Sequence, residues 1–462
     1  MAKPKIAFVE MENPSKLSIY SLMKMPRGIA ILCTLLDMAG YEVVGFVEQL
    51  KRFKWPELMH YDVICFSAIT CTIQPTYSLI AKLRKAGYKG VIILGGPHST
   101  AKPEEGILSG ADYVVRHEGE ITLLKLLKKI VRGRMPTRVP GVVFLQRGWI
   151  VHNLPRRLLT KEQLSALPAP TFQLLRGFEN MTAIPLCFTR GCPERCIFCA
   201  VKAMFGLAHR LSSVCSRLGQ ILAVKRNQFG LWLKSIFITD DNAFGGVRGA
   251  YMTKEFCQQM IDNNLVPPKG WGCQMRVDDV TEETVVLMRK AGCELACLGI
   301  ESTDDKTLKA VKKRVTREQE KTAIKILRAH HIRVMAMTVV GLDQDTFWSV
   351  LKTTLTLTWW GVDFLQILGI VPLPDTELAY QMEKECRILS RNYNLYNGHY
   401  VLVRPKNMSV FATRVAVKLF MPWFYLCTPN GWRLMLEFAP GFLKMIYTIA
   451  HQWTIGTVLR RV

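Results

Sequence analysis

The chain has 462 residues, which is long enough for two or three domains with substantial hydrophobic cores. Hydrophobic residues make up 49% and charged residues 21%, a composition that excludes a disordered chain. The formal net charge of +24 suits nucleic acid, anionic lipid headgroups or phosphorylated molecules as partners, or simply a solvated basic surface. Because Lys and Arg are scattered and no nucleic-acid motif is recognisable, we expect no nucleic-acid partner.

The beginning of the sequence, MAKPKIAFVEMENP, has no apolar core of signal-peptide length after its basic residues. A membrane-spanning helix needs about 18 apolar residues. The best candidates, 419–432 and 445–459, are shorter and are interrupted by proline or polar residues. The 14 cysteines lie mostly in apolar runs, as in reduced cytosolic proteins. We therefore expect a cytoplasmic protein without a spanning helix.

Residues 1–140 alternate between strand-like and helix-like runs, several of which end at glycine. Strands separated by single helices predict a doubly wound sheet, with a ligand edge where the strands end. The absence of GxGxxG at the first turn disfavours a dinucleotide, whereas paired glycines would let another large ligand approach the backbone. The strand ends of interest are Ser67 to Thr70, the run Gly95, Gly96, Pro97 and His98, and the pair Glu118 and Gly119.

Residues 141–180 contain a hairpin-like pair of runs, followed by the proline-punctuated stretch LPRRLLTKEQLSALPAP. We interpret this segment as a linker that wraps one domain onto the other. The sequence shows no internal repeat or low-complexity tract on either side of it.

Six strand-like runs follow the linker, and amphipathic segments separate them. The runs are AIPLCFTRGC, KSIFITDD, GWGCQMRV, LACLGIES, RVMAMTVVG and FLQILGIVPL. This alternation predicts a parallel sheet with right-handed crossovers, closed as a partial barrel over residues 181–382. Catalytic residues of parallel barrels lie at the carboxyl ends of the strands. The polar residues at these ends are Asp240, Asp241, Asn242, Gln274, Arg276, Glu301 and Ser302.

These polar residues also have purely structural interpretations. Asp240, Asp241 and Asn242 can each cap the helix that follows their strand. Gln274 and Arg276 can be polar groups of the barrel interior that satisfy one another.

Three cysteines, Cys192, Cys196 and Cys199, lie within eight residues in the stretch RGCPERCIFCA. They are odd in number and too close together for several useful disulfides. A structural zinc site normally takes four protein ligands, and a partner pair such as CxxC or HxxxH is not evident nearby. An iron-sulfur cluster bound by three thiolates leaves one iron open to an external ligand, as a reactive cluster requires.

Residues 383–462 no longer alternate and become aromatic and basic, which predicts a mainly helical carboxyl-terminal segment. Its helices can bury their apolar faces against the barrel. Alternatively, an apolar face with flanking cations can lie in the interface of the membrane's inner face and collect a lipid-like substrate. The flanking cations are Lys418, Arg433, Lys444, Arg460 and Arg461.

The spacing C-x3-C-x-aromatic-C, with Phe198 before the last cysteine, resembles the signature of the radical S-adenosylmethionine (radical SAM) enzymes. The resemblance implies that the three cysteines bind a 4Fe-4S cluster whose open iron chelates SAM. An electron from an external donor then releases a 5'-deoxyadenosyl radical. It also implies that Phe198 and the seven polar strand-end residues contact SAM. PLPDTEL, residues 372–378, resembles the family's PLPGT turn, with Asp375 in place of glycine.

Together with this signature, the strand ends LGGPH and GE resemble the cobalamin-binding domain of the cobalamin-dependent radical SAM enzymes. The resemblance implies that cobalamin binds at the strand ends of residues 1–140 named above. A DxHxxG motif is absent, but many members of this family lack it and hold cobalamin without a histidine below the cobalt. We therefore interpret His98 as a loop or wall residue. Some relatives keep the domain without using cobalamin.

The predicted fold is α/β, with an N-terminal doubly wound domain, a partial (β/α)6 barrel and a mainly helical carboxyl-terminal segment. The expected reaction is methylation of an unactivated carbon of an apolar, lipid-like or ring metabolite. RPKNMS, residues 404–409, resembles the lipid-modifying members. Without cobalamin, the same radical can drive ring closure, ring contraction or dehydration. A non-catalytic alternative is a cobalamin or iron sensor, or a peripheral membrane-binding protein.

Overall fold

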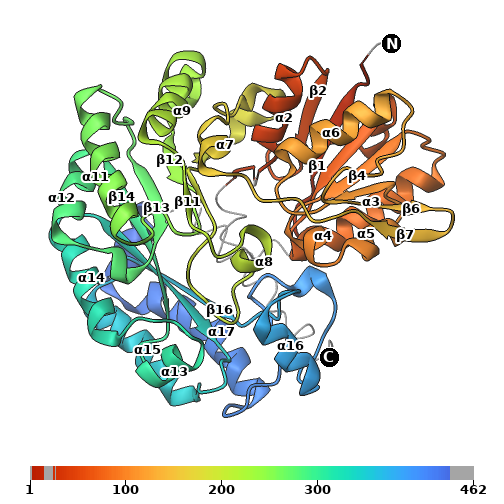
Figure 1. Ribbon diagram of the computed structural model, residues 1–462. Coiled ribbons are helices and arrows are strands. Elements are labelled where there is room, and N and C mark those ends of the chain that lie inside the picture. Colours follow the sequence, from red (N-terminus) through yellow and green to blue (C-terminus); the bar gives the residue numbers. More distant parts are fainter. Residues whose placement is uncertain (1–2, 15–23, 27, 438–462) are drawn as a thin grey trace.

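A computed structural model describes residues 3–14, 24–26 and 28–437. It contains two α/β units side by side (Figure 1). The chain beyond the barrel first contacts the N-terminal unit through the 3-10 helix Tyr393–Leu395 and then returns to pack against the barrel. The described residues therefore combine the three parts that the sequence predicts: a doubly wound unit, a six-stranded partial barrel and a helical carboxyl-terminal segment. The candidate span 445–459 and the cations Lys444, Arg460 and Arg461 lie outside the described residues.

The N-terminal sheet has the strand order β7-β6-β5-β4-β3-β1-β2-β8. β1 pairs with β2 on one side and with β3 on the other, all in parallel. The order in which strands are added to the sheet therefore reverses at β1, as in a doubly wound sheet. Strands such as VIILG in β4 are rich in Val and Ile because helices cover both faces of the sheet. The strands are β1 (Ile6–Glu10), β2 (Val43–Val47), β3 (Val63–Ser67), β4 (Val91–Gly95), β5 (Tyr113–Val115), β6 (Val142–Gln146), β7 (Trp149–His152) and β8 (Leu175–Arg176).

Residues 141–180, the expected linker, extend this sheet at both of its edges. β6 and β7 form an antiparallel hairpin beside β5, and β8 pairs with β2 at the opposite edge. The helices of the unit are α2 (Ile29–Met38), α3 (Ile73–Lys85), α4 (Pro97–Ala101), α5 (Pro103–Leu108) and α6 (Gly119–Val131), and the linker adds α7 (Lys161–Ser165).

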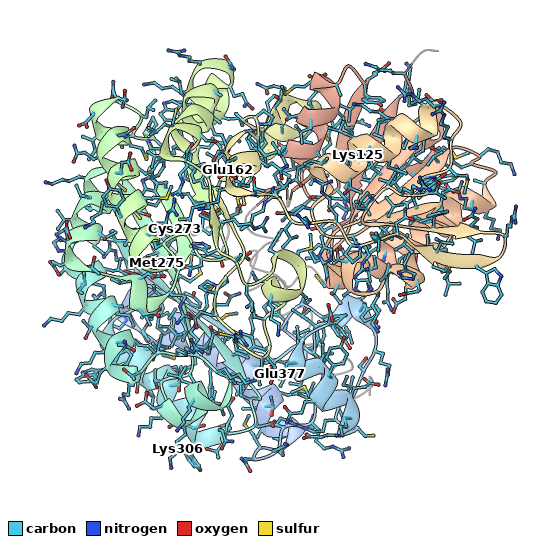
Figure 2. All side chains as sticks on the ribbon, in the orientation of Figure 1. Lys125, Glu162, Cys273, Met275, Lys306 and Glu377 are labelled. Atoms are coloured by element: carbon cyan, nitrogen blue, oxygen red, sulfur yellow. The ribbon has the colours of Figure 1, made fainter. Side chains whose placement is uncertain are left out.

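The barrel sheet contains six parallel strands in the order β16-β15-β14-β13-β12-β9, one for each of the six predicted runs. They are β9 (Ala183–Leu186), β12 (Ser235–Ile238), β13 (Trp271–Met275), β14 (Cys293–Glu301), β15 (Arg333–Val340) and β16 (Phe364–Gly369). β10 (Thr189–Arg190) and β11 (Arg210–Leu211) form a separate short ladder. In Figure 2, Cys273 and Met275 of β13 lie inside the protein, in the core between the barrel sheet and its outer helices, whereas Lys125 and Lys306 point outward.

Helices surround the outside of the barrel sheet, and several begin at a side-chain cap. Thr316 and Thr346 each accept a hydrogen bond from a backbone amide of the first helical turn. The helices are α8 (Val201–Phe205), α9 (Val214–Asn227), α10 (Phe229–Trp232), α11 (Gly246–Asp262), α12 (Glu282–Lys290), α13 (Asp305–Ala310), α14 (Arg317–Ala329), α15 (Phe347–Trp360) and α16 (Glu377–Lys384).

The carboxyl-terminal segment forms α17 (Val410–Cys427) and α18 (Pro429–Glu437) within the described residues. α17 is long and apolar enough to cross a membrane by length and composition alone, with a mean hydropathy of 1.3. The sequence predicts only a shorter apolar run here, at 419–432. The helix begins earlier because the hydroxyl of Ser409 caps it, accepting a hydrogen bond from the Ala412 amide at 3.0 Å.

The two units share a continuous hydrophobic core, which the linker completes. The Thr171 amide donates to Oγ1 of Thr34 in α2 at 2.7 Å, and the Phe172 amide donates to Oε1 of Gln228 beside α10 at 3.1 Å. The Phe172 ring is fully buried between the units. Residues of the segment 141–180 thus contact both units.

Candidate active site between the two sheets

A cavity of about 360 Å³ lies where the carboxyl ends of strands from both sheets meet. Of the residues that the sequence assigns to cobalamin, six line this cavity: Ser67, Gly95, Gly96, Pro97, Glu118 and Gly119. From the barrel side, Thr239 and Asp241 follow β12, and Cys187 follows β9. The residues singled out at the ends of two separate sheets therefore surround one common space.

Gly96 is required by the protein backbone. Its φ is 99°, a conformation that favours glycine. A Cβ atom at this position would lie 2.6 Å from the carbonyl oxygen of Ala68. The sequence pattern indicates only that the paired glycines would let a ligand approach the backbone closely. The structure shows that contact with the neighbouring strand already requires glycine here.

Thr70 and His98 do not belong to the cavity lining. The His98 side chain is fully buried, with Nδ1 3.3 Å from Thr70 Oγ1 and Nε2 3.3 Å from a Glu105 carboxylate oxygen. Tyr393, from the short 3-10 helix Tyr393–Leu395, packs its ring 4.7 Å from the imidazole. His98 is thus a packing residue beneath the carboxyl-terminal segment, while its predicted contact with cobalamin has no support from the cavity geometry.

The cysteine loop runs from β10 to α8 and is held by backbone hydrogen bonds. The Ile197 amide donates to the Val311 carbonyl at 3.3 Å, and the Leu378 amide donates to the Ile197 carbonyl at 3.0 Å. Phe198 packs against a cluster that includes Leu378 and Met382. The aromatic residue of the motif therefore anchors the loop to α13 and α16.

Cys192, Cys196 and Cys199 are half-buried and form no disulfide. Burial raises the pKa of all three thiols, to about 12 for Cys199. The Arg276 cation opposes this rise in pKa at Cys192 and Cys196. The Lys313 cation opposes it at Cys196. Buried thiols beside cations suit a metal centre, because bound iron would stabilise the thiolate forms.

Within the described residues, no three His, Cys, Asp or Glu side chains converge on one point as a single metal ion would require. A structural zinc site takes four protein ligands, whereas a 4Fe-4S cluster with one open iron takes three thiolates, each on a different iron atom. The three cysteines therefore have the chemistry and the spacing to hold a 4Fe-4S cluster.

Glu301 ends β14 in an unusual backbone conformation, with φ at 64°. Its carboxylate accepts a hydrogen bond of 2.7 Å from the buried ammonium of Lys313, which also donates to the Gly299 carbonyl at 2.7 Å. A left-handed conformation is unfavourable for glutamate and typically persists where function requires it. The Lys313 cation also opposes the rise in the pKa of Cys196. Lys313 and its partner Glu301 therefore lie beside the cysteine loop.

The other predicted SAM residues separate into structural and accessible groups. Asp240 is buried, and one oxygen accepts from the Phe188 and Thr189 amides at 2.7 and 3.0 Å. Arg276 is paired through two hydrogen bonds with Asp278. Two further side chains also bond to nearby backbone. Asn242 accepts hydrogen bonds from the Phe244 and Gly245 amides, and Ser302 accepts one from the Asp304 amide. Gln274 lies half-buried on β13.

Asp241 differs from its neighbours because its side chain is exposed to the cavity. Burial beneath the surrounding protein, with a contribution from Asp240, raises its pKa to about 6. His117, which sequence analysis missed, also lines the cavity. Its Nδ1 lies 3.1 Å from the Met204 carbonyl and must carry the proton, and burial lowers its pKa. The only sequence signal for His117 was its position directly before Glu118.

The cavity and the cysteine loop are connected by α8. Met204 and Phe205 of this helix line the cavity, and the helix begins two residues after Cys199. The Thr100 hydroxyl lies 3.5 Å from the Met204 sulfur, so α8 also contacts the N-terminal unit. This helix carries the chain from the cysteine loop to the cavity wall.

Asp375 occupies the glycine position of the PLPGT-like turn with φ at 63°. Asp enters the left-handed region more readily than most residues, which explains why it can replace glycine there. The Tyr380 hydroxyl donates to its carboxylate at 2.8 Å. The turn therefore has a backbone conformation in which glycine would be unstrained.

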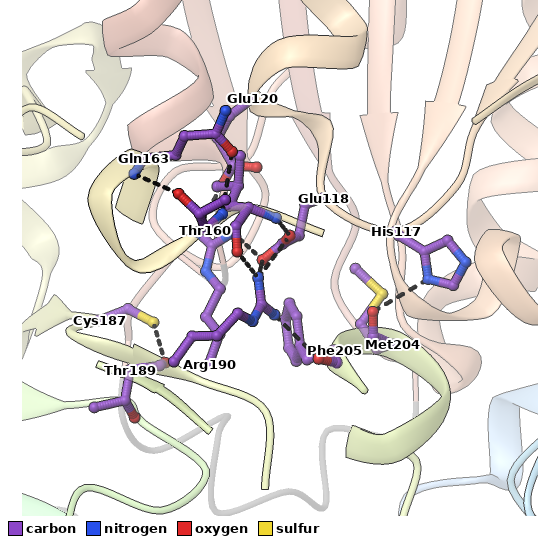
Figure 3. Close-up of polar contacts among 12 residues, drawn as sticks. His117, Glu118, Glu120, Thr160, Gln163, Cys187, Thr189, Arg190, Met204 and Phe205 are labelled. Atoms are coloured by element: carbon purple, nitrogen blue, oxygen red, sulfur yellow. Dashed lines mark hydrogen bonds and ion pairs between the residues drawn. The ribbon is translucent and has the colours of Figure 1, made fainter. Parts of the chain in front are cut away.

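A buried charge cluster joins the two units beside the cavity (Figure 3). Arg190 donates to Glu118 at 3.1 Å and to Glu120 at 2.6 Å, while Arg210 donates to Glu118 at 2.8 Å and to the Leu159 carbonyl at 2.8 Å. Burial would raise the pKa of Glu120, but the Arg190 charge outweighs it and lowers that pKa. Both arginines were missed, because nothing local in the sequence pairs them with residues of the N-terminal unit.

Comparison with known proteins agrees with this geometry. The B12 binding domain matches residues 24–127, and the Radical SAM superfamily matches residues 186–357. The two ranges together cover more than half of the chain and correspond to the two units. The chain therefore belongs to the cobalamin-dependent radical SAM enzymes, whose cofactors are a 4Fe-4S cluster, SAM and cobalamin.

Several characterised and uncharacterised enzymes are similar over most of the chain. An uncharacterised methyltransferase of Pyrococcus horikoshii is 26% identical over 72% of this chain and 72% of that protein. The anaerobic magnesium-protoporphyrin IX monomethyl ester cyclase of Cereibacter sphaeroides is 27% identical over 83% of this chain and 64% of its own length. The hopanoid C-3 methylase of Methylococcus capsulatus is 24% identical over 82% of this chain and 72% of its own length.

Among solved structures, the radical SAM methyltransferase TsrM from Kitasatospora setae has a similar fold. It was determined with tryptophan substrate and a SAM analogue bound. The TM-score is 0.70 at 16% identity, over 83% of this chain and 76% of that one. The arrangement of a doubly wound unit before a partial barrel is therefore shared by both proteins.

The buried charge cluster should contribute to the stability of the fold. Arg190→Met leaves the Glu120 carboxylate buried without its cation, so we expect the free energy of unfolding to fall by about 3–5 kcal/mol at pH 7. The loss should shrink as the pH falls toward 4, because an unpaired buried carboxylate takes up a proton. Denaturant unfolding at several pH values measures both effects.

Two further variants control this experiment. Arg190→Met combined with Glu120→Gln should recover part of the loss, because it removes the unpaired charge. Arg289→Met breaks the more exposed pair with Glu294 and should cost less than about 1 kcal/mol. An equal effect of Arg190→Met and Arg289→Met would contradict the assigned role of the cluster.

The Asp375 turn generates a second prediction. Asp375→Gly and Asp375→Ala both remove the hydrogen bond with Tyr380, so their difference reports the backbone conformation alone. We expect the alanine variant to unfold with about 1 kcal/mol less free energy than the glycine variant, because alanine is strained at positive φ. Thermal unfolding of both variants tests this, and equal stability would show that the turn does not require the left-handed conformation.

Proposed function

We propose that this enzyme methylates an unactivated carbon of an apolar, lipid-like or ring-shaped metabolite. The observation that carries the proposal is the shared cavity, onto which strand ends of the cobalamin-binding sheet and of the barrel both open. When bound, the cluster and SAM supply a 5'-deoxyadenosyl radical that removes hydrogen, and cobalamin supplies the methyl group. Both chemistries must reach the same carbon, so one chamber between the two units suits the reaction.

The cavity walls support an apolar substrate. Aromatic, aliphatic and proline side chains predominate, among them Phe8, Leu32, Leu123, Pro170, Phe172 and Phe205. Such walls bury an apolar ligand and exclude water, which protects a reactive radical from side reactions. Asp241 and His117 are polar groups on these walls that can orient a polar end of the substrate. The similarity to hopanoid C-3 methylase supports a lipid-like compound.

The chain's own residues have distinct tasks in this proposal. Cys192, Cys196 and Cys199 hold the cluster, and the cations of Arg276 and Lys313 offset part of the thiolate charge. Glu301, fixed by Lys313, presents a carboxylate beside the cysteine loop that can bind the amino group of SAM. Met204 and Phe205 of α8 add apolar surface to the cavity wall.

A second candidate is radical ring closure, which the similarity to the anaerobic cyclase favours. Lipids and pigments extracted from cells with and without the gene can be compared by mass. A product heavier by one methylene group supports methylation. Loss of hydrogen or water from a metabolite supports the second candidate.

Substitution in the cysteine loop tests the proposed radical chemistry. Cys196→Ala should lose most of its iron and sulfide after anaerobic reconstitution, and 5'-deoxyadenosine should fall to background because three thiolates are needed to hold the cluster. Cys215→Ala is the matched control, since this exposed cysteine lies on α9 away from the loop. It should retain both properties. Undiminished 5'-deoxyadenosine from Cys196→Ala would rule out the assigned cluster ligands.

Filling the cavity tests where cobalamin binds. Gly119 lines the cavity at the start of α6, and a Cβ there would be only in ordinary contact with Leu32, at 3.6 Å. Gly119→Phe should therefore preserve the fold yet lower the corrinoid retained on purification by about tenfold. The corrinoid absorbance band measures retention, and circular dichroism checks the fold.

The control is Gly219→Phe, at an exposed helix position where an added Cβ meets nothing within 4 Å. This variant should retain cobalamin at the level of the unmodified protein. If Gly119→Phe retained as much corrinoid as Gly219→Phe, the cavity would not be the cobalamin site.

A further inference from the structure

Helices α15, α17 and α18 expose an unusual amount of apolar surface. In the described part of the chain, seventeen large hydrophobic side chains are exposed, and seven of them lie on these three helices. We call this set the aromatic face: Trp348, Leu355, Trp359, Phe411, Leu419, Leu426 and Trp432. Trp348, Trp359 and Phe411 are each more than 70% exposed. None of the seven lines the cavity. Concentrations of exposed apolar side chains typically mark an interaction surface.

The aromatic face is the outer side of helices whose inner sides are already packed. The Phe347 ring of α15 lies 5.4 Å from the Phe420 ring of α17. The Tyr425 hydroxyl is 3.1 Å from both the amide and the carbonyl of Leu365, which joins α17 to β16. Only 22% of α17 is buried, although its composition is that of a core helix. Packing against the barrel therefore accounts for one side of α17 but not for the apolar residues on its outer side.

Cations predominate on the helices that carry the aromatic face. α15 and α17 contain Lys352, Arg414 and Lys418 but neither Asp nor Glu. α18 adds the exposed Arg433 and ends at an acidic residue, Glu437. Arg414 and Lys418 are half-buried and one turn apart on α17, so two like charges lie close together there. Cations beside tryptophan side chains match the headgroup region of an anionic bilayer, where Trp and Lys or Arg residues concentrate.

We propose that the aromatic face of α15, α17 and α18 docks this enzyme onto the surface of a membrane that contains anionic lipids. α17 lies along the surface, because its inner side is bonded to β16 and its sequence includes Arg414, Lys418 and Pro422. Tryptophan side chains enter the interface, and the cations contact lipid phosphates. The aromatic face is separate from the cavity, so its proposed role does not rest on the proposed reaction.

Vesicle binding by the full-length protein tests this inference. Sedimentation is compared between phosphatidylcholine vesicles and vesicles that also contain about 30% phosphatidylglycerol. The unmodified protein should bind the anionic vesicles at least about tenfold more tightly than the neutral ones, as expected for several cations near the surface. Equal or undetectable binding to both vesicle types would overturn the inference.

Paired variants locate the binding surface. Trp348→Glu combined with Trp359→Glu should weaken binding to anionic vesicles by about tenfold or more, because both side chains leave the interface. Trp149→Glu is the matched control, since Trp149 is 77% exposed on β7 of the N-terminal unit. It should change binding less than about twofold, because an exposed charge far from the docking surface contributes little.

Two measurements distinguish lost lipid contacts from unfolding and from self-association. Circular dichroism shows whether the double variant remains folded, and Lys352→Glu provides a milder charge reversal that should weaken anionic binding about fivefold or more. Light scattering without vesicles detects self-association. If the unmodified protein were a dimer and the double variant a monomer, a second copy would occupy the face and the membrane inference would be wrong.

Discussion

A buried cluster of opposite charges fixes how the two sheets of this protein face each other. Arg190 and Arg210 come from the barrel unit, whereas Glu118 and Glu120 come from the end of β5 and the start of α6. Charges removed from water are stabilised only when their partners are in place. The cluster therefore favours one relative position of the units, and in that position the strand ends of both sheets surround the same cavity.

Arg190 also connects this cluster to the cysteine loop, because only Gly191 separates it from Cys192. Gly191 has φ at 82°, and a Cβ there would lie 2.4 Å from the Ala208 carbonyl oxygen. The chain thus turns sharply between the charge cluster and the first cysteine of the loop. The contact that joins the units and the cysteine loop are consecutive in the sequence, which keeps the two regions in a defined geometry.

Much of this arrangement could be predicted from the sequence because it depends on local patterns. The six barrel strands follow from apolar runs at regular intervals, and the cysteine spacing indicates the cluster without any knowledge of the fold. The positive φ of Asp375 likewise agrees with the glycine that the resembling motif has at that position. Such features are encoded within a few consecutive residues.

The features that could not be predicted depend on partners distant in the sequence. Glu118 lines the cavity, and its carboxylate also accepts a hydrogen bond from Arg210, 92 residues away, which the sequence does not indicate. Asp240 satisfies backbone amides of another strand, 51 and 52 residues away. The residues of the expected linker pair with both edges of the N-terminal sheet. A sequence pattern identifies a polar strand end, but not which of several polar groups reaches it.

The contact between Tyr393 and the N-terminal unit affects the order in which the protein can fold. The Tyr393 hydroxyl donates to Glu105 across 288 residues of chain, and the tyrosine ring covers His98. During synthesis the N-terminal sheet leaves the ribosome first, and domains generally begin to fold in that order. Tyr393 can cover His98 only after nearly the whole polypeptide has emerged. The first unit to form is consequently among the last to be completed.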